Sequence, residues 1–188
     1  MHRYTLISPL AAVLLACGGG GDGMSSQQPA SAGDESAAFT WEDAITSARA
    51  ADATLIPIEV ELEQVEGRTL IEVEGIRGDA VVELYYDPAS GALVQEGVEE
   101  LTPEEQASLP ALRQRLASGD PRLEDGLAMA RQRYAADELR EVELEMHGDR
   151  LVLEVEVERD GQTTAWVHDA ASGELLGEED EDEHAAEE

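Results

Sequence analysis

The chain has 188 residues and carries 43 acidic against 12 basic side chains, which gives a formal net charge of −31 at pH 7. Phosphate binding needs clustered positive charge, so this balance excludes nucleic acid as a natural partner. Apolar residues make up 42% of the chain and aromatic residues only 4%. That is enough aliphatic surface for one modest core or two small ones, and a large enzyme domain is not expected.

The first 17 residues have the features of an export signal. Arg3 is followed by an uncharged apolar run from Tyr4 to Ala16, shorter than the about 20 residues that a membrane-spanning helix needs. The run ends in Leu14-Leu15-Ala16-Cys17, which resembles the lipobox of bacterial lipoprotein precursors. The resemblance implies that residues 1–16 are a signal peptide and that Cys17 becomes the lipidated first residue. An ordinary secretory signal with a chance cysteine is the alternative.

The same resemblance bears on where the protein resides. A lipid anchor on Cys17 predicts attachment to the cell envelope with the folded part facing the periplasm, because buried acyl chains hold a protein on a bilayer. Gly18 stands where an aspartate would favour inner-membrane retention in Gram-negative lipoproteins. The outer membrane is therefore favoured if the organism has one.

Two segments have the composition of unfolded chain. Residues 17–38 are rich in glycine, serine and alanine and nearly free of large apolar groups, which predicts a flexible tether. Residues 178–188 read EEDEDEHAAEE and hold eight carboxylates without a cation, which predicts a disordered acidic tail.

An internal repeat fills the part between tether and tail. Residues 41–97 align without a gap to residues 123–179 at a constant offset of 82. The matching segments include Glu59–Glu63 with Glu141–Glu145, Glu72–Glu74 with Glu154–Glu156, and Asp87–Gly91 with Asp169–Gly173. The repeat predicts two copies of one supersecondary unit, at residues 39–97 and 120–177, joined by a helical connector at residues 98–119.

Each copy begins with a helix. In the first copy Thr40 is a candidate N-cap with Asp43 three residues on, and apolar residues recur at helical spacing from Trp41 to Ala48. In the second copy Asp120 is the candidate cap and Pro121 the first helical residue. In the connector, Thr102-Pro103 starts a helix that Pro110 is expected to interrupt.

Strands follow each helix, because the apolar period changes from 3.6 to two. Ile58, Val60 and Leu62 alternate with glutamates in the first copy, as do Val142 and Leu144 in the second. Turns are predicted at Glu66-Gly67 and at Gly148-Asp149. Each copy closes with an Asp-x-x-Ser-Gly turn, in which the aspartate can bond the turn backbone and the glycine takes a positive φ.

This order of helix, antiparallel strands and Asp-x-x-Ser-Gly turn resembles the PepSY domain. The resemblance implies an α+β fold with two tandem PepSY-like units, each a helix packed on a three- to four-stranded antiparallel sheet. It also implies an extracytoplasmic module of the kind found in peptidase propeptides, where it restrains the peptidase. The chain has no His-Glu-x-x-His motif, so any peptidase would be a separate chain.

No pattern in the sequence indicates catalysis. Cys17 is used by the anchor, and the histidines beyond the signal, His147, His168 and His184, fall in a turn, at a strand end and in the tail. We therefore predict that the protein is not an enzyme, that it needs no cofactor and that it has no dedicated metal site.

The polar feature repeated in both copies is a row of strand glutamates. Alternation puts them on one side of the sheet, where like charges opposed across strands destabilise the pairing by a fraction of a kcal/mol each. The candidate partner-binding residues are Glu59, Glu61, Glu63, Glu72, Glu74, Glu143, Glu145, Glu154 and Glu156. A solvated, salt-screened face with help from Arg68, Arg150 and Arg159 is one interpretation; a basic protein surface and loose divalent cations are the others.

The sequence thus predicts a non-catalytic cell-envelope lipoprotein whose PepSY-like modules bind, and in some settings restrain, a peptidase or another envelope protein. The alternative is an acidic lipoprotein that binds or buffers divalent cations weakly.

The lipid anchor can be tested directly. Cys17→Ser removes the thiol that accepts the diacylglyceryl group, so the variant should stay uncleaved or become soluble and should no longer incorporate labelled palmitate. Metabolic labelling followed by gel fluorography measures this. A wild-type protein without label would contradict the lipobox interpretation.

Overall fold

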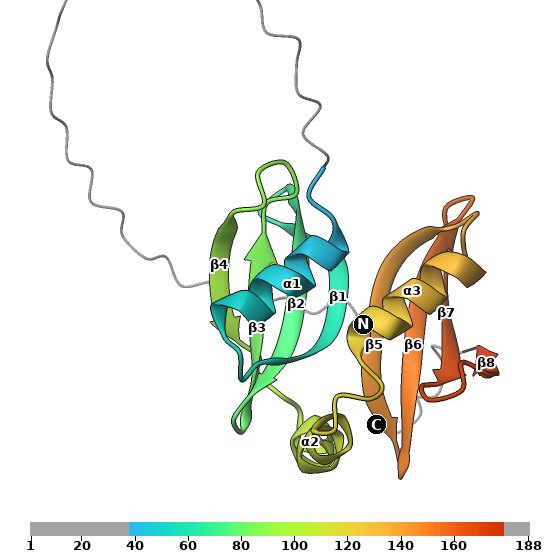
Figure 1. Cartoon of the computed structure of the whole chain (residues 1–188). Helices are drawn as coiled ribbons and strands as arrows, with labels where there is room; N and C mark the ends of the chain where they lie inside the picture. Colours follow the sequence, from blue (N-terminus) through green and yellow to red (C-terminus); the bar gives the residue numbers. More distant parts are fainter. Residues whose placement is uncertain (1–37, 179–188) are drawn as a thin grey trace, which may run out of the picture. The chain divides into compact units, whose positions relative to one another are not determined.

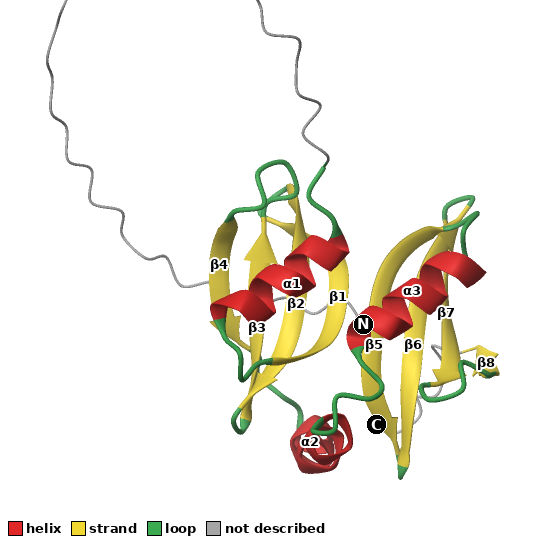
Figure 2. Cartoon of the chain, viewed as in Figure 1, coloured by secondary structure: helices red, strands yellow, loops and turns green. Residues whose placement is uncertain are grey.

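The computed structural model describes residues 38–178, which form three helices and one eight-stranded antiparallel sheet (Figures 1 and 2). The helices are α1 (Trp41–Ala51), α2 (Pro103–Leu116) and α3 (Leu123–Arg133). The strands are β1 (Ile56–Val65), β2 (Arg68–Arg77), β3 (Ala80–Tyr86), β4 (Leu93–Val98), β5 (Glu138–His147), β6 (Arg150–Arg159), β7 (Gln162–Asp169) and β8 (Leu175–Glu178). Cys17, the predicted signal peptide and nearly all of the predicted tether and tail lie outside the described residues. None of the described helices is long and apolar enough to cross a membrane.

The predicted mixture of helix and antiparallel sheet is confirmed. The strands follow one another in the order β4-β3-β2-β1-β5-β6-β7-β8, so each half of the chain contributes four neighbouring strands. Equivalent helices and strands start 82 residues apart, for example α1 at Trp41 and α3 at Leu123. The sequence did not reveal that the two sets of strands join edge to edge in a single sheet.

The joint between the halves is the antiparallel pairing of β1 with β5. Its register places Val60 opposite Val142, which is its own equivalent in the repeat, with Glu59 opposite Glu143 and Glu61 opposite Glu141 on either side. Glu59 and Glu141 are equivalents, as are Glu61 and Glu143, so the two glutamate pairs are the same contact made twice. This is the arrangement of an isologous two-fold interface. Locally, the two halves of one chain are related like the subunits of a dimer.

The helices carry the same reciprocity. Arg49 on α1 contacts Glu124 on α3 through Nε at 3.0 Å and Nη2 at 3.2 Å. Arg131 on α3 contacts Glu42 on α1 through Nε at 2.8 Å and Nη2 at 3.0 Å. Arg131 and Glu124 are the equivalents of Arg49 and Glu42, so one interaction is made twice. These pairs are partly exposed and set the pairing geometry more than the stability.

The core lies between the sheet and the helices α1 and α3, which cover the same sheet face (Figure 1). Val60 and Val142 at the joint are fully buried in this core, as are Ile45 on α1 and Leu127 on α3. One cluster of buried aliphatic side chains runs through both halves. The predicted single or paired small core is therefore one shared core.

The helix starts confirm one capping prediction and correct another. The Thr40 hydroxyl accepts a bond from the Asp43 N–H, and the Asp43 carboxylate accepts one from the Thr40 N–H, which is the predicted capping box. For α3 the predicted cap is wrong. The cap is Arg122, which makes no side-chain capping bond; the Asp120–Pro121 peptide bond is cis, and the helix begins at Leu123.

The connector is helical, as predicted, but Pro110 does not interrupt it. α2 continues through Pro110, although proline removes one backbone donor. Leu109, Leu112 and Leu116 are buried along one side of α2, and this packing holds the helix together on both sides of the proline.

The hairpin turns at Asp87 and Asp169 are formed as predicted. Asp169 Oδ1 accepts bonds from the Ser172 N–H at 2.9 Å and from the Ser172 hydroxyl at 2.8 Å. Gly173 takes a φ of 68°, which favours glycine. The bonds from Ser172 lower the pKa of Asp169, and those from Ser90 lower that of Asp87. The ionised carboxylates are therefore part of the turns.

Asp169→Ala should lower the melting temperature, because the turn before β8 loses its acceptor, whereas Asp169→Asn keeps an acceptor oxygen and should lower it less. Thermal denaturation followed by circular dichroism at pH 7 compares the two. Because both carboxyl pKa values are lowered by folding, the stability they contribute is present above about pH 4 and lost below it. Equal melting temperatures for Asp169→Ala and wild type would contradict this role.

Candidate functional site

Nine glutamates form two uninterrupted rows across the middle of the sheet. The first row consists of residues that oppose one another from β3 to β6, namely Glu83, Glu74, Glu59, Glu143 and Glu154. The second row, from β2 to β6, consists of Glu72, Glu61, Glu141 and Glu156. Strands lie about 4.8 Å apart, so adjacent backbone positions in a row are about that far from each other.

Both rows lie on the sheet face opposite the helices, which we call the glutamate face. Val60, Val73 and Val142 alternate with these glutamates and belong to the core beneath α1 and α3. Since successive side chains on a strand point to opposite faces, the glutamates face away from the helices. The prediction that these residues share one side of the sheet therefore agrees with the observed register.

The register changes which glutamates make up the rows. Glu63 and Glu145 share the face but oppose Leu70 and Val152, so they lie beside the rows and not in them. Glu83 and Glu141 also belong to the rows, although they are not among the predicted partner-binding residues. Both alternate with buried aliphatic residues, and that alternation was the signal that could have found them.

The expectation of a fully solvated face is wrong for three of the glutamates. Glu59, Glu72 and Glu83 are only 8%, 3% and 5% exposed. Tyr85, opposite Glu72 on β3, is also buried, and its hydroxyl hydrogen bonds with the Glu72 and Glu83 carboxyls. Gly97 on β4 opposes Glu83, and any Cβ there would clash with the Glu83 carboxylate. A glycine at the sheet edge therefore leaves room for this carboxyl.

Burial and crowding change the charge state of these carboxyls. Burial, followed by the charges of Glu74 and Glu61, raises the pKa of Glu72 to about 11. Burial, followed by a hydrogen bond with Glu99, raises the pKa of Glu83 to about 8. Burial and the neighbouring glutamates also raise the pKa of Glu59. The formal charge of −31 thus overstates the charge of the folded protein at neutral pH, because some of these groups keep their protons.

Two of the arginines expected to offset the face are paired elsewhere. Arg68 contacts Asp87 at 3.1 Å, and Arg159 binds Asp137. Both pairs support turns or strand ends. Arg68 and Arg159 therefore pair with these aspartates and are not the counter-ions of the strand glutamates.

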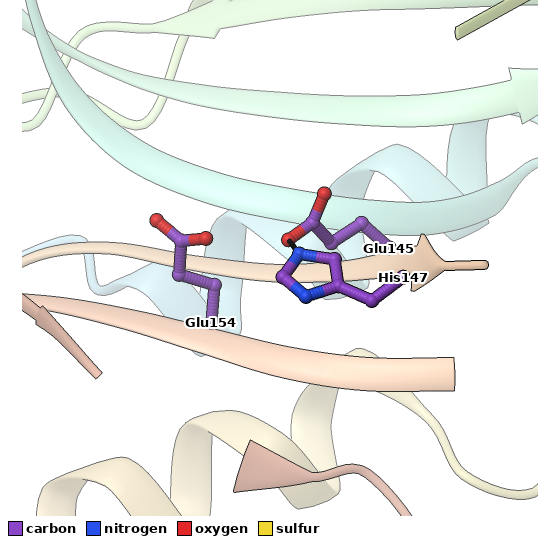
Figure 3. Close-up of side chains that lie close together, drawn as sticks. All are labelled: Glu145, His147 and Glu154. Atoms are coloured by element: carbon purple, nitrogen blue, oxygen red, sulfur yellow. Dashed lines mark hydrogen bonds and ion pairs between the residues drawn. The ribbon is translucent and has the colours of Figure 1, made fainter. Parts of the chain in front are cut away.

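Three groups of side chains on this face bring potential ligand atoms within 4.8 Å of one another. Two are all-carboxylate groups, Glu59 with Glu61 and Glu141, and Glu72 with Glu74 and Glu83. The third combines Glu145, His147 and Glu154 and is drawn in Figure 3. His147, predicted in a turn, is the last residue of β5, directly before that turn.

The described histidines do not come together. His147 accompanies the glutamates, whereas His168 is fully buried in the second half, with Arg133 Nη1 2.8 Å from Nδ1 and the Tyr134 hydroxyl 2.7 Å from Nε2. An arginine only donates, so Nδ1 is the acceptor and Nε2 carries the proton. Burial and the charge of Arg133 lower the pKa of His168. His168 is therefore a structural residue, more deeply buried than the sequence suggested.

A pocket of about 230 Å³ lies between the end of α2 and the start of β1, near Arg49 and Arg122. No histidine, cysteine or carboxylate lines it among the residues that the structure describes. Thr54 and Ser118 bring hydroxyls to it, but none of its described lining residues could act as their general base.

A family comparison supports part of the sequence interpretation. Residues 124–179 match the PepSY family, described as "Peptidase propeptide and YPEB domain". No curated protein matches the chain. A similar solved structure is the crystal structure of a "putative lipoprotein" from Clostridium difficile 630, with 16% identity and a TM-score of 0.47, covering 77% of this chain and 95% of that chain.

The buried carboxyls predict an unusual pH dependence. In the unfolded chain Glu72 and Glu83 lose their protons near pH 4.5, whereas the folded chain keeps them to about pH 11 and 8. Unfolding between these values releases protons, so the stability that these two carboxyls contribute is fully present below about pH 4.5 and falls as pH rises, by at most about 1.4 kcal/mol per pH unit for each carboxyl.

We expect the melting temperature to fall from pH 7 to pH 9, a window above the ordinary histidine pKa of about 6.5, so that His168 contributes little to the change. Glu72→Gln should raise the melting temperature at pH 9 and flatten the slope. Glu104→Gln, an exposed change on α2, is the control and should alter neither. A wild-type melting temperature that rises over this window would disprove the assignment.

Proposed function

We propose that this chain, which carries a PepSY domain at residues 124–179, is a non-catalytic, lipid-anchored cell-envelope module that binds a basic protein surface through its glutamate face. The 82-residue repeat supports a second PepSY-like unit in the first half, because α1 and β1–β4 have the element order and spacing of α3 and β5–β8. Each unit is then a helix on four antiparallel strands, and the two units present one binding face.

One observation carries this proposal: nine glutamates stand side by side in two unbroken rows over strands from both halves, and six of them, on β1, β2, β5 and β6, remain partly exposed. Like charges directly opposed on neighbouring strands destabilise a sheet. On a surface that serves only solubility, acidic and basic side chains are expected to be mixed. Concentrated acid on one face is the arrangement that attracts a basic partner and steers its approach.

A peptidase is the favoured class of partner. The matched family is described as "Peptidase propeptide and YPEB domain", and the chain has no His-Glu-x-x-His motif. Binding in trans would let such a module restrain a separate peptidase at the membrane. Weak binding or buffering of divalent cations is the alternative, and the two all-carboxylate groups on the face favour it.

Photo-crosslinking of the anchored protein in intact cells, followed by mass spectrometry, would identify the partner. Binding of that purified partner should weaken steeply from 0.1 M to 1 M NaCl, as the Debye length shortens from about 10 Å to about 3 Å. The triple change Glu61→Gln, Glu74→Gln and Glu143→Gln, at three partly exposed positions of the rows, should weaken binding about tenfold or more while sparing or raising thermal stability.

The control is a triple change of equal charge outside the rows: Glu100→Gln, Glu104→Gln and Glu174→Gln, all exposed. It should leave binding nearly unchanged. If both triple variants bind equally well, the interaction surface lies elsewhere. If calcium binds in calorimetry with a defined stoichiometry that survives removal of residues 178–188, and no basic partner is found, the cation alternative replaces the proposal.

A further inference from the structure

A mixed group of ligands lies at the hairpin end of β5 and β6. Glu145 and His147 are two residues apart on β5 and share a face, and Glu154 comes from the neighbouring strand β6 (Figure 3). His147 Nε2 lies 2.6 Å from Glu145 Oε1. One ligand atom from each of the three residues lies within 4.8 Å of the other two, so small side-chain rotations bring them around one centre.

The donor set suits a transition metal better than calcium or magnesium. Imidazole nitrogen is the commonest protein ligand for zinc and similar ions, and carboxylates complete many such sites. Calcium and magnesium take oxygen ligands. A metal ion binds an imidazole nitrogen without its proton, so an ion on His147 Nε2 would replace the contact of that atom with Glu145 Oε1.

The internal repeat supplies a comparison within the same chain. The residues 82 positions earlier are Glu63, Val65 and Glu72. Both carboxylates have a counterpart in the first half, but valine stands where the second half has histidine. The imidazole is therefore a departure from the duplicated pattern, and only the second half combines a nitrogen ligand with these carboxylates.

The surroundings favour a cation and leave it access. Glu143, opposite Glu154 in the first row, adds negative charge beside the group. The His147 side chain is 41% exposed and that of Glu145 is 29% exposed, so an ion can enter from solvent. Three ligands from this chain leave one position of a tetrahedral site open for water or for a ligand from another molecule.

We propose that Glu145, His147 and Glu154 form a binding site for a divalent transition-metal ion of the zinc type. The site does not depend on the proposed protein partner. An open fourth position would also let a bound ion be shared with a molecule that docks on the glutamate face.

Calorimetric titration with Zn²⁺ at 0.15 M NaCl tests the site in the full chain. The parent protein for the titration carries Cys17→Ser, because a free thiol is itself a zinc ligand. We expect one Zn²⁺ per chain. Since loss of an outer-shell partner already costs a metal site about 10–100-fold in affinity, His147→Ala should weaken binding at least about tenfold. Glu154→Gln should weaken it as well.

Two controls distinguish binding at this site from nonspecific attraction of cations to acidic side chains. His184→Ala removes the imidazole of the predicted tail and should leave Zn²⁺ affinity unchanged. Weak Ca²⁺ binding should not respond to His147→Ala. Zn²⁺ should also raise the melting temperature of the parent and not that of His147→Ala, whose own melting curve shows whether it is folded. Equal Zn²⁺ affinity in the parent and His147→Ala, or loss of binding in His184→Ala alone, would overturn the proposal.

Discussion

The pairing of β1 with β5 is the interaction on which the rest of the structure depends. It makes one sheet from two sets of four strands, and its centre at Val60 and Val142 is fully buried under both helices. Because the pairing is antiparallel and centred on equivalent residues, the pairing of Glu59 with Glu143 on one side of the centre is repeated by that of Glu61 with Glu141 on the other. The reciprocal contacts of Arg49 with Glu124 and of Arg131 with Glu42 follow from the same relation.

The same pairing creates the electrostatic character of the molecule. Each half brings a short block of opposed glutamates, and the register of β1 against β5 places the two blocks in line. A register slip of one residue would move the glutamates into the core, so the apolar alternation holds the rows in place. Burial of aliphatic side chains on the opposite face thus offsets the repulsion between the glutamates on this face. Protonation of buried carboxyls such as Glu72 relieves part of that repulsion.

The two halves keep the same framework but differ at single positions that carry chemistry. Tyr86 in the first half corresponds to the buried His168 in the second, where Arg133 and Tyr134 hold the ring. Val65 corresponds to His147, which stands beside carboxylates on the other face. The framework was duplicated as a whole, whereas the imidazoles belong to one half. Differences of this kind allow the two units to have separate roles.

The sequence by itself determined the local structure and the sidedness of the sheet. The capping box at Thr40, the alternation through Val60 and the turn at Asp169 depend on neighbouring residues, and short-range patterns report these well. Local patterns failed at α2, where buried leucines hold the helix together across Pro110, and at the start of α3, where the cap is Arg122 and not Asp120. The joining of the two halves, the inclusion of Glu83 in a row and the burial of Glu59 and Glu72 were decided only by the tertiary structure. These features depend on which strand edges meet and in which register, and that choice is set by the free energy of contacts between residues about 80 positions apart in the sequence.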